Sequence, residues 1–193
     1  MTVAEKELRE QKQYLTFLLA DEECAVNILK VKEIIEYAPL TAVPKAPTWV
    51  RGVTNLRGAV VPVVDLAAKF GLEQKPVSKT TCIVIIETRF EDQPVMMGVI
   101  ADAVSQVLEL SEEDIRPAPD FGTRVRMDYL LGMAQLGRKF ALLLDVDKVL
   151  TIEELYGLSE VSAHTQSAAA EKSAGWLATP PTKGGEDQGL PEE

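Results

Sequence analysis

Few side chains in this sequence are of a type that does chemistry, and those few are poorly placed for it. The single histidine is His164, so the commonest general base and metal ligand is restricted to one position. Cys24 and Cys82 each lie in an apolar run, without a histidine or a second cysteine at metal-ligand spacing. Both cysteines are therefore predicted to be reduced and to pack as small hydrophobic residues.

Carboxylates are the remaining candidates for catalysis, since two of them suffice for a glycosidase. The close acidic residues Asp145 with Asp147 and Glu112 with Glu113 lie where helices are expected to begin, which favours capping and solvation over acid–base work. The chain carries no glycine-rich phosphate-binding motif, and its aromatic content of 6% leaves little to stack against sugars. The sequence predicts a protein that is not an enzyme and that holds no metal ion or cofactor.

Charge limits the partners of the chain. The net charge of −10 over 193 residues repels phosphate backbones and anionic lipids, so neither nucleic acid nor membrane insertion is expected. Residues 1–13 are charged and lack the apolar core of a secretory signal, and no apolar run reaches the roughly 18 residues that span a bilayer. We expect a cytoplasmic protein with protein partners. A β-barrel that binds RNA is the alternative from a different class of function, and the net charge opposes it.

Runs rich in aliphatic and β-branched residues predict a mainly β protein. The expected strands are 14–19, 24–28, 32–37, the two runs that Gly58 separates within 52–66, and then 80–88, 95–101, 104–110 and 138–144. Pro62 has no N–H for a ladder, which predicts a sheet edge or a bulge at that residue.

Short helices are predicted by their capping residues. Asp65 is placed to cap a helix that runs to Phe70 and ends at Gly71. Ser111 begins a capping-box pattern. Asp145 and Thr151 are expected to open further short helices that run to about residue 158.

One internal repeat is visible when the sequence is shifted by 80 residues. Three residues then coincide with identical ones, namely Gly52 with Gly132, Leu56 with Leu136 and Asp65 with Asp145. Both segments show a glycine, a strand, a glycine-containing turn, an apolar strand and an aspartate. The repeat predicts two similar small β subdomains, each marginal alone and stabilised by packing on the other.

The domain organisation predicted from composition has three parts: a polar lead-in at 1–13, a folded region at 14–158 and a tail at 159–193. The tail is rich in Ala, Ser, Gly, Pro and charged residues, so it cannot bury enough apolar area to offset the entropy of ordering. We predict a disordered acidic tail. Trp176-Leu177 is an apolar pair within it, for which a short docking motif is the alternative.

The segment Gly52-Val53-Thr54-Asn55-Leu56-Arg57-Gly58, followed by Val61-Pro62-Val63-Val64-Asp65-Leu66, resembles the signature of the CheW family of chemotaxis coupling proteins. Segments 28–34, 115–119 and 129–132 agree with the family in order and spacing, so the resemblance covers about residues 14–158. It implies a mainly β fold of two SH3-like, five-stranded β-barrel subdomains, intertwined and carrying a few short helices.

The same resemblance implies a function without catalysis. Members of the family are adaptors that join the cytoplasmic tips of chemoreceptors to the regulatory domain of a CheA-type histidine kinase. A CheW-like adaptor of another chemosensory pathway, such as pilus-based motility, is the alternative within the same class.

Candidate protein-binding residues also follow from the resemblance. Five positions match those that the family uses for coupling, and Asn55 is added because it lies beside Arg57; the six are Val31, Glu33, Gly52, Asn55, Arg57 and Val107. Arg57 could clamp a partner's carboxylate, or could form an internal ion pair that supports its turn. Val31 and Val107 could line an apolar groove for a receptor helix, or could be ordinary barrel core. Gly52 could serve only the backbone.

Overall fold

The computed structural model describes residues 11–90, 93–118, 125–151, 153–154 and 157. The predicted disorder of 159–193, the lone histidine His164 and the Trp176-Leu177 pair lie outside the described residues. No helix within the described part of the chain is long and apolar enough to cross a membrane.

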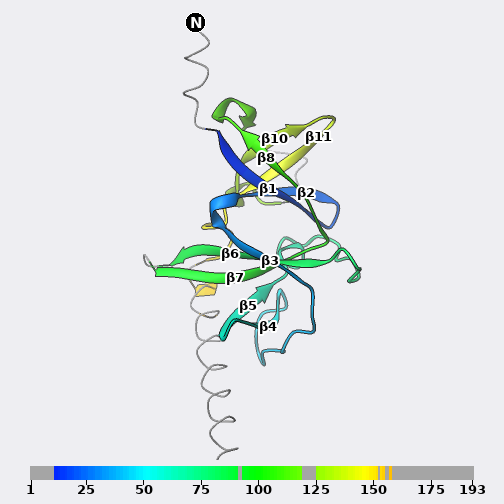
Figure 1. Cartoon of the computed structure of the whole chain (residues 1–193), viewed down its shortest axis with the longest axis vertical. Coiled ribbons are helices and arrows are strands. Elements are labelled where there is room, and N and C mark those ends of the chain that lie inside the picture. The colour runs from blue at the N-terminus through cyan, green and yellow to red at the C-terminus, as the bar shows by residue number, and fades with distance from the viewer. Residues whose placement is uncertain (1–10, 91–92, 119–124, 152, 155–156, 158–193) are drawn as a thin grey trace, which may run out of the picture.

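Two β-sheets make up the described fold (Figure 1). The six-stranded sheet has the order β8 (Ala103–Leu110), β1 (Lys12–Leu19), β2 (Glu22–Asn27), β11 (Lys139–Leu144), β10 (Leu130–Leu136) and β9 (Ile115–Arg116). The five-stranded sheet has the order β3 (Val31–Glu36), β6 (Cys82–Phe90), β7 (Gln93–Ala101), β5 (Ala59–Val64) and β4 (Val50–Leu56). The predicted mainly β class with two β units is confirmed, and the two-residue strand β9 gives one sheet a sixth strand.

The five-stranded sheet uses the continuous stretch from β3 to β7, whereas the six-stranded sheet combines β1 and β2 with β8 to β11. The chain therefore begins one sheet, leaves it through the 3-10 turn η1 (Ile28–Lys30), completes the other sheet and then returns. Figure 1 shows β3 to β7 below the strands of the six-stranded sheet.

Apolar packing is concentrated between the two sheets. The largest buried cluster holds 22 residues and takes side chains from both sheets, among them Phe17, Val84, Met97 and Leu144. The clusters that belong to each sheet alone are small, with six and four buried residues. Since a buried aliphatic side chain contributes about 1.5–3 kcal/mol, most of the hydrophobic stabilisation comes from the contact between the sheets.

The cysteines behave largely as the sequence predicted. Cys24 is fully buried in the shared cluster and Cys82 packs partly buried against it, both as free thiols. Burial raises the pKa of the Cys24 thiol, and the charges of Glu22 and Glu23 raise it further. A thiol held neutral in this way is a poor nucleophile.

The 80-residue repeat is confirmed as a structural duplication of two hairpins. β4 and β5 pair with the same register as β10 and β11, and each hairpin has a bulge just before its glycine, Gly52 or Gly132. The backbone N–H of Asp65 donates to the carbonyl of Trp49, and that of Asp145 donates to the carbonyl of Tyr129, both at 2.8 Å. Each sheet also holds one parallel strand pair, β5 with β7 and β2 with β11.

Pro62 does not lie on an edge strand, because β5 runs between β4 and β7. Val53, opposite Pro62, makes both of its backbone hydrogen bonds to Thr41 on the other side, at 2.8 and 3.0 Å. The ladder from β5 to β7 contains only Val63 and Val64. Pro62, which has no N–H, therefore lies just before the ladder between β5 and β7 starts. The expectation of an edge or bulge at Pro62 is wrong.

The predicted capping residues Asp65, Ser111 and Thr151 are confirmed. The Asp65 carboxylate accepts the Ala68 N–H at 2.9 Å and opens α2 (Leu66–Lys69), and Ser111 forms a capping box with Asp114 before η2 (Glu112–Asp114). Thr151 and Glu154 cap each other reciprocally, and residues 153, 154 and 157 are helical.

The helix predicted at Asp145 is wrong. Its carbonyl accepts the N–H groups of Lys148 and Val149, at 2.9 and 3.1 Å, but the segment is a turn. The Val146 carbonyl accepts the Thr88 hydroxyl at 3.3 Å. The Asp147 carboxylate binds Lys30 of η1 and Thr88 of β6, so this segment is bonded to distant parts of the chain.

We predict that Gly132→Ala destabilises the protein by about 2 kcal/mol or more. Gly132 has φ +154°, and an added Cβ would lie 2.7 Å from the carbonyl oxygen of Arg116; such strain and overpacking cost this much. Gly137→Ala is the control, because its φ is +59° with no atom within 4 Å of an added Cβ, and only the left-handed penalty of about 1 kcal/mol remains. Equal losses of the free energy of unfolding in denaturant titrations would contradict this.

Candidate protein-binding surface

The turn between β4 and β5 presents Arg57 in an unusual backbone conformation. Arg57 and Gly58 have φ values of +52° and +92°, the pattern of a type I′ hairpin turn, in which Asn-Gly is favoured. The Asn55 side chain secures the turn by accepting the Gly58 N–H at 2.8 Å. The corresponding turn between β10 and β11 has Gly137 in place of Arg57. An arginine at this position costs local stability, so its side chain is a candidate for function.

Arg57 and Glu33 form an ion pair across the five-stranded sheet. Arg57 Nη2 donates to Glu33 Oε2 at 3.0 Å, and the Arg57 side chain is 81% exposed while that of Glu33 is 26% exposed. The pair is the internal one that the sequence left open as an alternative. A guanidinium has five donors, however, so one carboxylate leaves most of the exposed group able to bind a partner.

Gly52 lies beneath this surface and not on it. Its φ is +145°, and an added Cβ would lie 2.5 Å from the carbonyl oxygen of Thr41. The residue allows the preceding loop to approach β4 closely, so any effect of substituting it passes through the backbone. Arg57 pairs with Glu33, and Asn55 binds the same turn, while Gly52 lies in β4, the strand that carries Asn55 and leads into Arg57.

The two valines lie on different sheets. Val31 begins β3 and is partly buried against the shared core, which agrees in part with its alternative role as core. Val107 lies on β8 opposite Leu15 and is 48% exposed. Val31 therefore shares β3 with Glu33, the partner of Arg57, whereas Val107 belongs to the other sheet.

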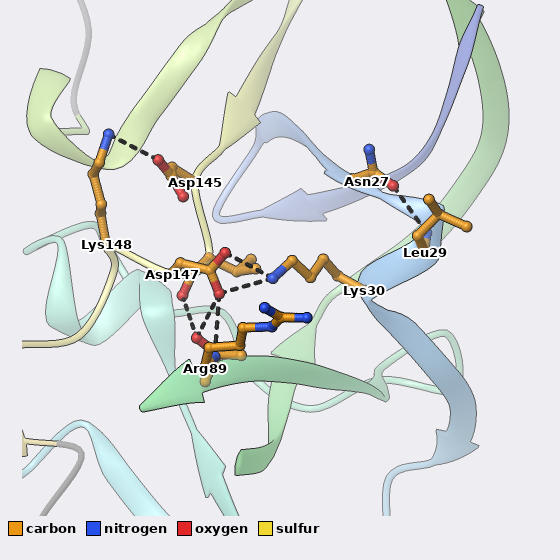
Figure 2. Close-up of polar contacts among 9 residues, drawn as sticks. Asn27, Leu29, Lys30, Arg89, Asp145, Asp147 and Lys148 are labelled. Atoms are coloured by element: carbon orange, nitrogen blue, oxygen red, sulfur yellow. Dashed lines mark hydrogen bonds and ion pairs between the residues drawn. The ribbon is translucent and has the colours of Figure 1, made fainter. Parts of the chain in front are cut away.

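Two exposed apolar residues near Val31 were not predicted from the sequence. Leu29 in η1 is 83% exposed, and Ile34 in β3 is 45% exposed. Leu29 is held outward because Asn27 caps η1, its side chain accepting the Leu29 N–H at 2.9 Å (Figure 2). An asparagine before a short aliphatic run was the available signal, but the helical spacing of residues 28–35 obscured it.

A polar cluster around Asp147 joins the two sheets (Figure 2). The Asp147 carboxylate accepts two hydrogen bonds from Lys30 Nζ, at 2.7 and 2.9 Å, as well as one from the Thr88 hydroxyl at 2.9 Å and one from the Arg89 backbone N–H at 3.2 Å. Lys30 lies in the link between the sheets, Asp147 follows β11, and Thr88 and Arg89 belong to β6. The cluster therefore fixes the six-stranded sheet against the five-stranded one.

Burial and hydrogen bonding act in opposite directions on Asp147. Partial burial would raise the pKa of its carboxyl group, but the hydrogen bonds from Lys30 and Thr88, with the charge of Lys30, hold the pKa below the ordinary 3.8. Nearby Asp145 instead pairs with Lys148 at 3.0 Å. Sequence reasoning placed both aspartates at a helix start and missed the role of Asp147, because its partners are distant in the chain.

Comparisons with known proteins identify similar chains. A model of the CheW-like domain family matches residues 13–154. The chemotaxis protein CheW of Klebsiella aerogenes is 41% identical over 144 residues, covering 75% of this chain and 84% of that protein. The chemotaxis protein CheW of Rhizobium meliloti is 37% identical over 155 residues, covering 80% and 97%. The crystal structure of the scaffolding protein TtCheW from Thermoanaerobacter tengcongensis matches with a TM-score of 0.67 at 29% identity, covering 75% of this chain and 90% of that one.

We predict that Asp147→Asn lowers the free energy of unfolding by about 1 kcal/mol at neutral pH, a value reduced for the partial exposure of the Lys30 pair. A depressed carboxyl pKa stabilises the fold above the unfolded-state pKa, and this contribution is lost as the pH falls through the lower folded-state pKa. The difference from the parent protein should therefore shrink as the pH falls below 3.8.

Denaturant titrations at several pH values measure this difference. Asp128→Asn is the control, because Asp128 pairs with Arg126 where both side chains are more than 70% exposed. If the two variants behaved alike, the Asp147 cluster would not join the sheets energetically.

Proposed function

This chain belongs to the CheW family and is a chemotaxis scaffold protein without catalytic activity, and we propose that it couples chemoreceptor tips to the regulatory domain of a CheA-type histidine kinase. Coupling of this kind takes place in the cytoplasm, where we propose that the chain acts. A CheW-like adaptor for pilus-based motility would differ in the receptor that co-purifies with it.

The observation that carries the proposal is the exposed Arg57–Glu33 pair. Arg57 has a left-handed backbone conformation, whereas the equivalent position in the duplicate hairpin is Gly137. This conformation lowers local stability for a residue other than glycine, which favours a functional role for the Arg57 side chain. In our proposal Arg57 binds a carboxylate or carbonyl oxygens of the partner, and Glu33 orients the guanidinium. Asn55 holds the turn, and Gly52 lets the supporting loop pack against β4.

Apolar residues supply a second contact in the proposal. Leu29 and Val107 expose aliphatic side chains, and Val31 lies next to η1 with part of its surface free. An amphipathic receptor helix recognises such residues by inserting its apolar face. Val31 and Val107 then contribute to receptor binding from different sheets.

Signalling in this scheme involves no covalent step. A scaffold that binds one kinase conformation better than another shifts the kinase population by the difference in affinity. The extensive core between the sheets keeps both contacts in a fixed relation. Individual contacts can be weak, because linked binding events raise the effective concentration.

We predict that Arg57→Glu leaves the fold intact and reduces receptor-stimulated kinase activity about tenfold or more, since truncating or reversing a central charged contact costs at least this much. Circular dichroism and thermal melting check the fold, and reconstituted receptor–kinase assays measure coupling. Arg138→Glu, an exposed arginine in the equivalent turn of the other hairpin, is the matched control and should couple normally.

The double variant Glu33→Arg/Arg57→Glu separates binding from support of the turn. It restores the internal ion pair with its charges exchanged, so it would recover coupling if the pair served only the hairpin. Our proposal requires it to remain defective, because the partner would still meet a carboxylate at position 57.

We further predict that Val107→Glu weakens receptor binding about tenfold, a typical cost for a central apolar contact, with little change in thermal stability because Val107 is half exposed. Binding to a receptor signalling fragment measures the effect. Val77→Glu, also at an exposed valine but in the segment between α2 and β6, is the control; equal affinities of both variants would remove Val107 from the contact.

A further inference from the structure

An apolar cavity is lined by the loop that precedes β4 and by residues near the C-terminal end of the described chain. Its volume is about 300 Å³, and among the described residues its walls come from 43–47, 49 and 50 and from the helical residues 153, 154 and 157. Val43, Pro44, Pro47 and Trp49 are among the apolar lining residues, and Gly157 also lines the cavity. The volume is at the lower end of the range for ligand pockets, which suits one or two large side chains.

The wall of this cavity is fixed by a buried cation. Lys69 Nζ lies 4.6 Å from the centroid of the Trp49 ring and forms an ion pair with Glu154. The Lys69 side chain is only 7% exposed, so Trp49, α2 and the C-terminal helical residues are held together with the Glu154 charge compensated. An apolar occupant can therefore enter without leaving this charge unpaired.

The chain itself provides a suitable occupant. The CheW-like family model ends at residue 154, whereas the chain continues to residue 193. Trp176-Leu177 is the only pair of adjacent large apolar residues within 158–193, and no charged residue occurs from Ser173 to Thr182. An uncharged segment around an aromatic side chain matches an apolar cavity.

Chain length permits the contact. Trp176 lies nineteen positions after Gly157, a residue of the cavity wall. A flexible chain of that length has an end-to-end distance of about 24 Å, and the entropy of closing such a loop grows only slowly with length. The effective concentration is then in the millimolar range, so a dissociation constant below that range is enough to fill the cavity.

We propose that Trp176 and Leu177 of the same chain occupy this cavity, so that the C-terminal segment folds back against the loop before β4. The remainder of the tail needs no fixed structure for this contact. The proposal is independent of the partners assigned above, since it concerns the free chain.

Tryptophan fluorescence tests the proposal, because Trp49 and Trp176 are the only tryptophans. In the full chain with Trp49→Phe, Trp176 is the sole reporter, and an aromatic ring still lines the cavity. We expect a blue-shifted emission and a collisional quenching constant several-fold below that of a solvated tryptophan. Adding Val43→Glu should abolish both effects, whereas adding Val77→Glu, which is outside the cavity, should leave them unchanged.

A second measurement keeps Trp49. The indole N–H resonance of Trp49 should shift when Trp176→Ala and Leu177→Ala are introduced together into the full chain. Solvated emission from Trp176 together with an unmoved Trp49 resonance would overturn the proposal. Protection that depends on protein concentration would also overturn it, because a second copy would then supply the segment, as would protection that survives Val43→Glu.

Discussion

Packing between the two sheets is the interaction on which the whole molecule depends. Each sheet encloses only a handful of buried side chains of its own, while the shared cluster draws on both. The Asp147 cluster adds a directional constraint to this non-directional packing, because a carboxylate with donors from Lys30, Thr88 and Arg89 is satisfied in one arrangement of the sheets. A scaffold needs such rigidity, because a framework that deforms when one partner binds does not pass that change on to the other partner.

The duplicated hairpin occurs once in each sheet, with a different turn in each copy. Both copies keep the bulge, the glycine and the backbone bond from the aspartate. They differ at the turn, where one copy has Gly137 and the other has Arg57 under backbone strain. The two turns carry arginine and glycine in opposite order, Arg57-Gly58 and Gly137-Arg138, so the same hairpin presents its arginine from a different backbone position in each copy.

The fold was predictable from the sequence wherever local chemistry decides it. Strand runs, the Asp65 cap and the repeat depend on neighbouring residues, and the structure confirms them. Predictions failed where distant residues decide. The turn after Asp145 is bonded through Asp147 to Lys30, 117 positions away. Pro62 is tolerated inside a sheet because the ladder from β5 to β7 begins one residue later. The sequence allowed an internal ion pair for Arg57 but did not identify Glu33 as its partner, because the two residues are brought together only by the arrangement of the strands.

The order of the strands has a consequence for synthesis on the ribosome. All strands of the five-stranded sheet lie between residues 31 and 101 and can pair as soon as they emerge. β1 and β2 emerge earlier still, yet their sheet neighbours β8 and β11 end only at residues 110 and 144. The hairpin of β1 and β2 therefore keeps its apolar face exposed while the five-stranded sheet is synthesised and forms. The nascent chain is most vulnerable to aggregation during that interval.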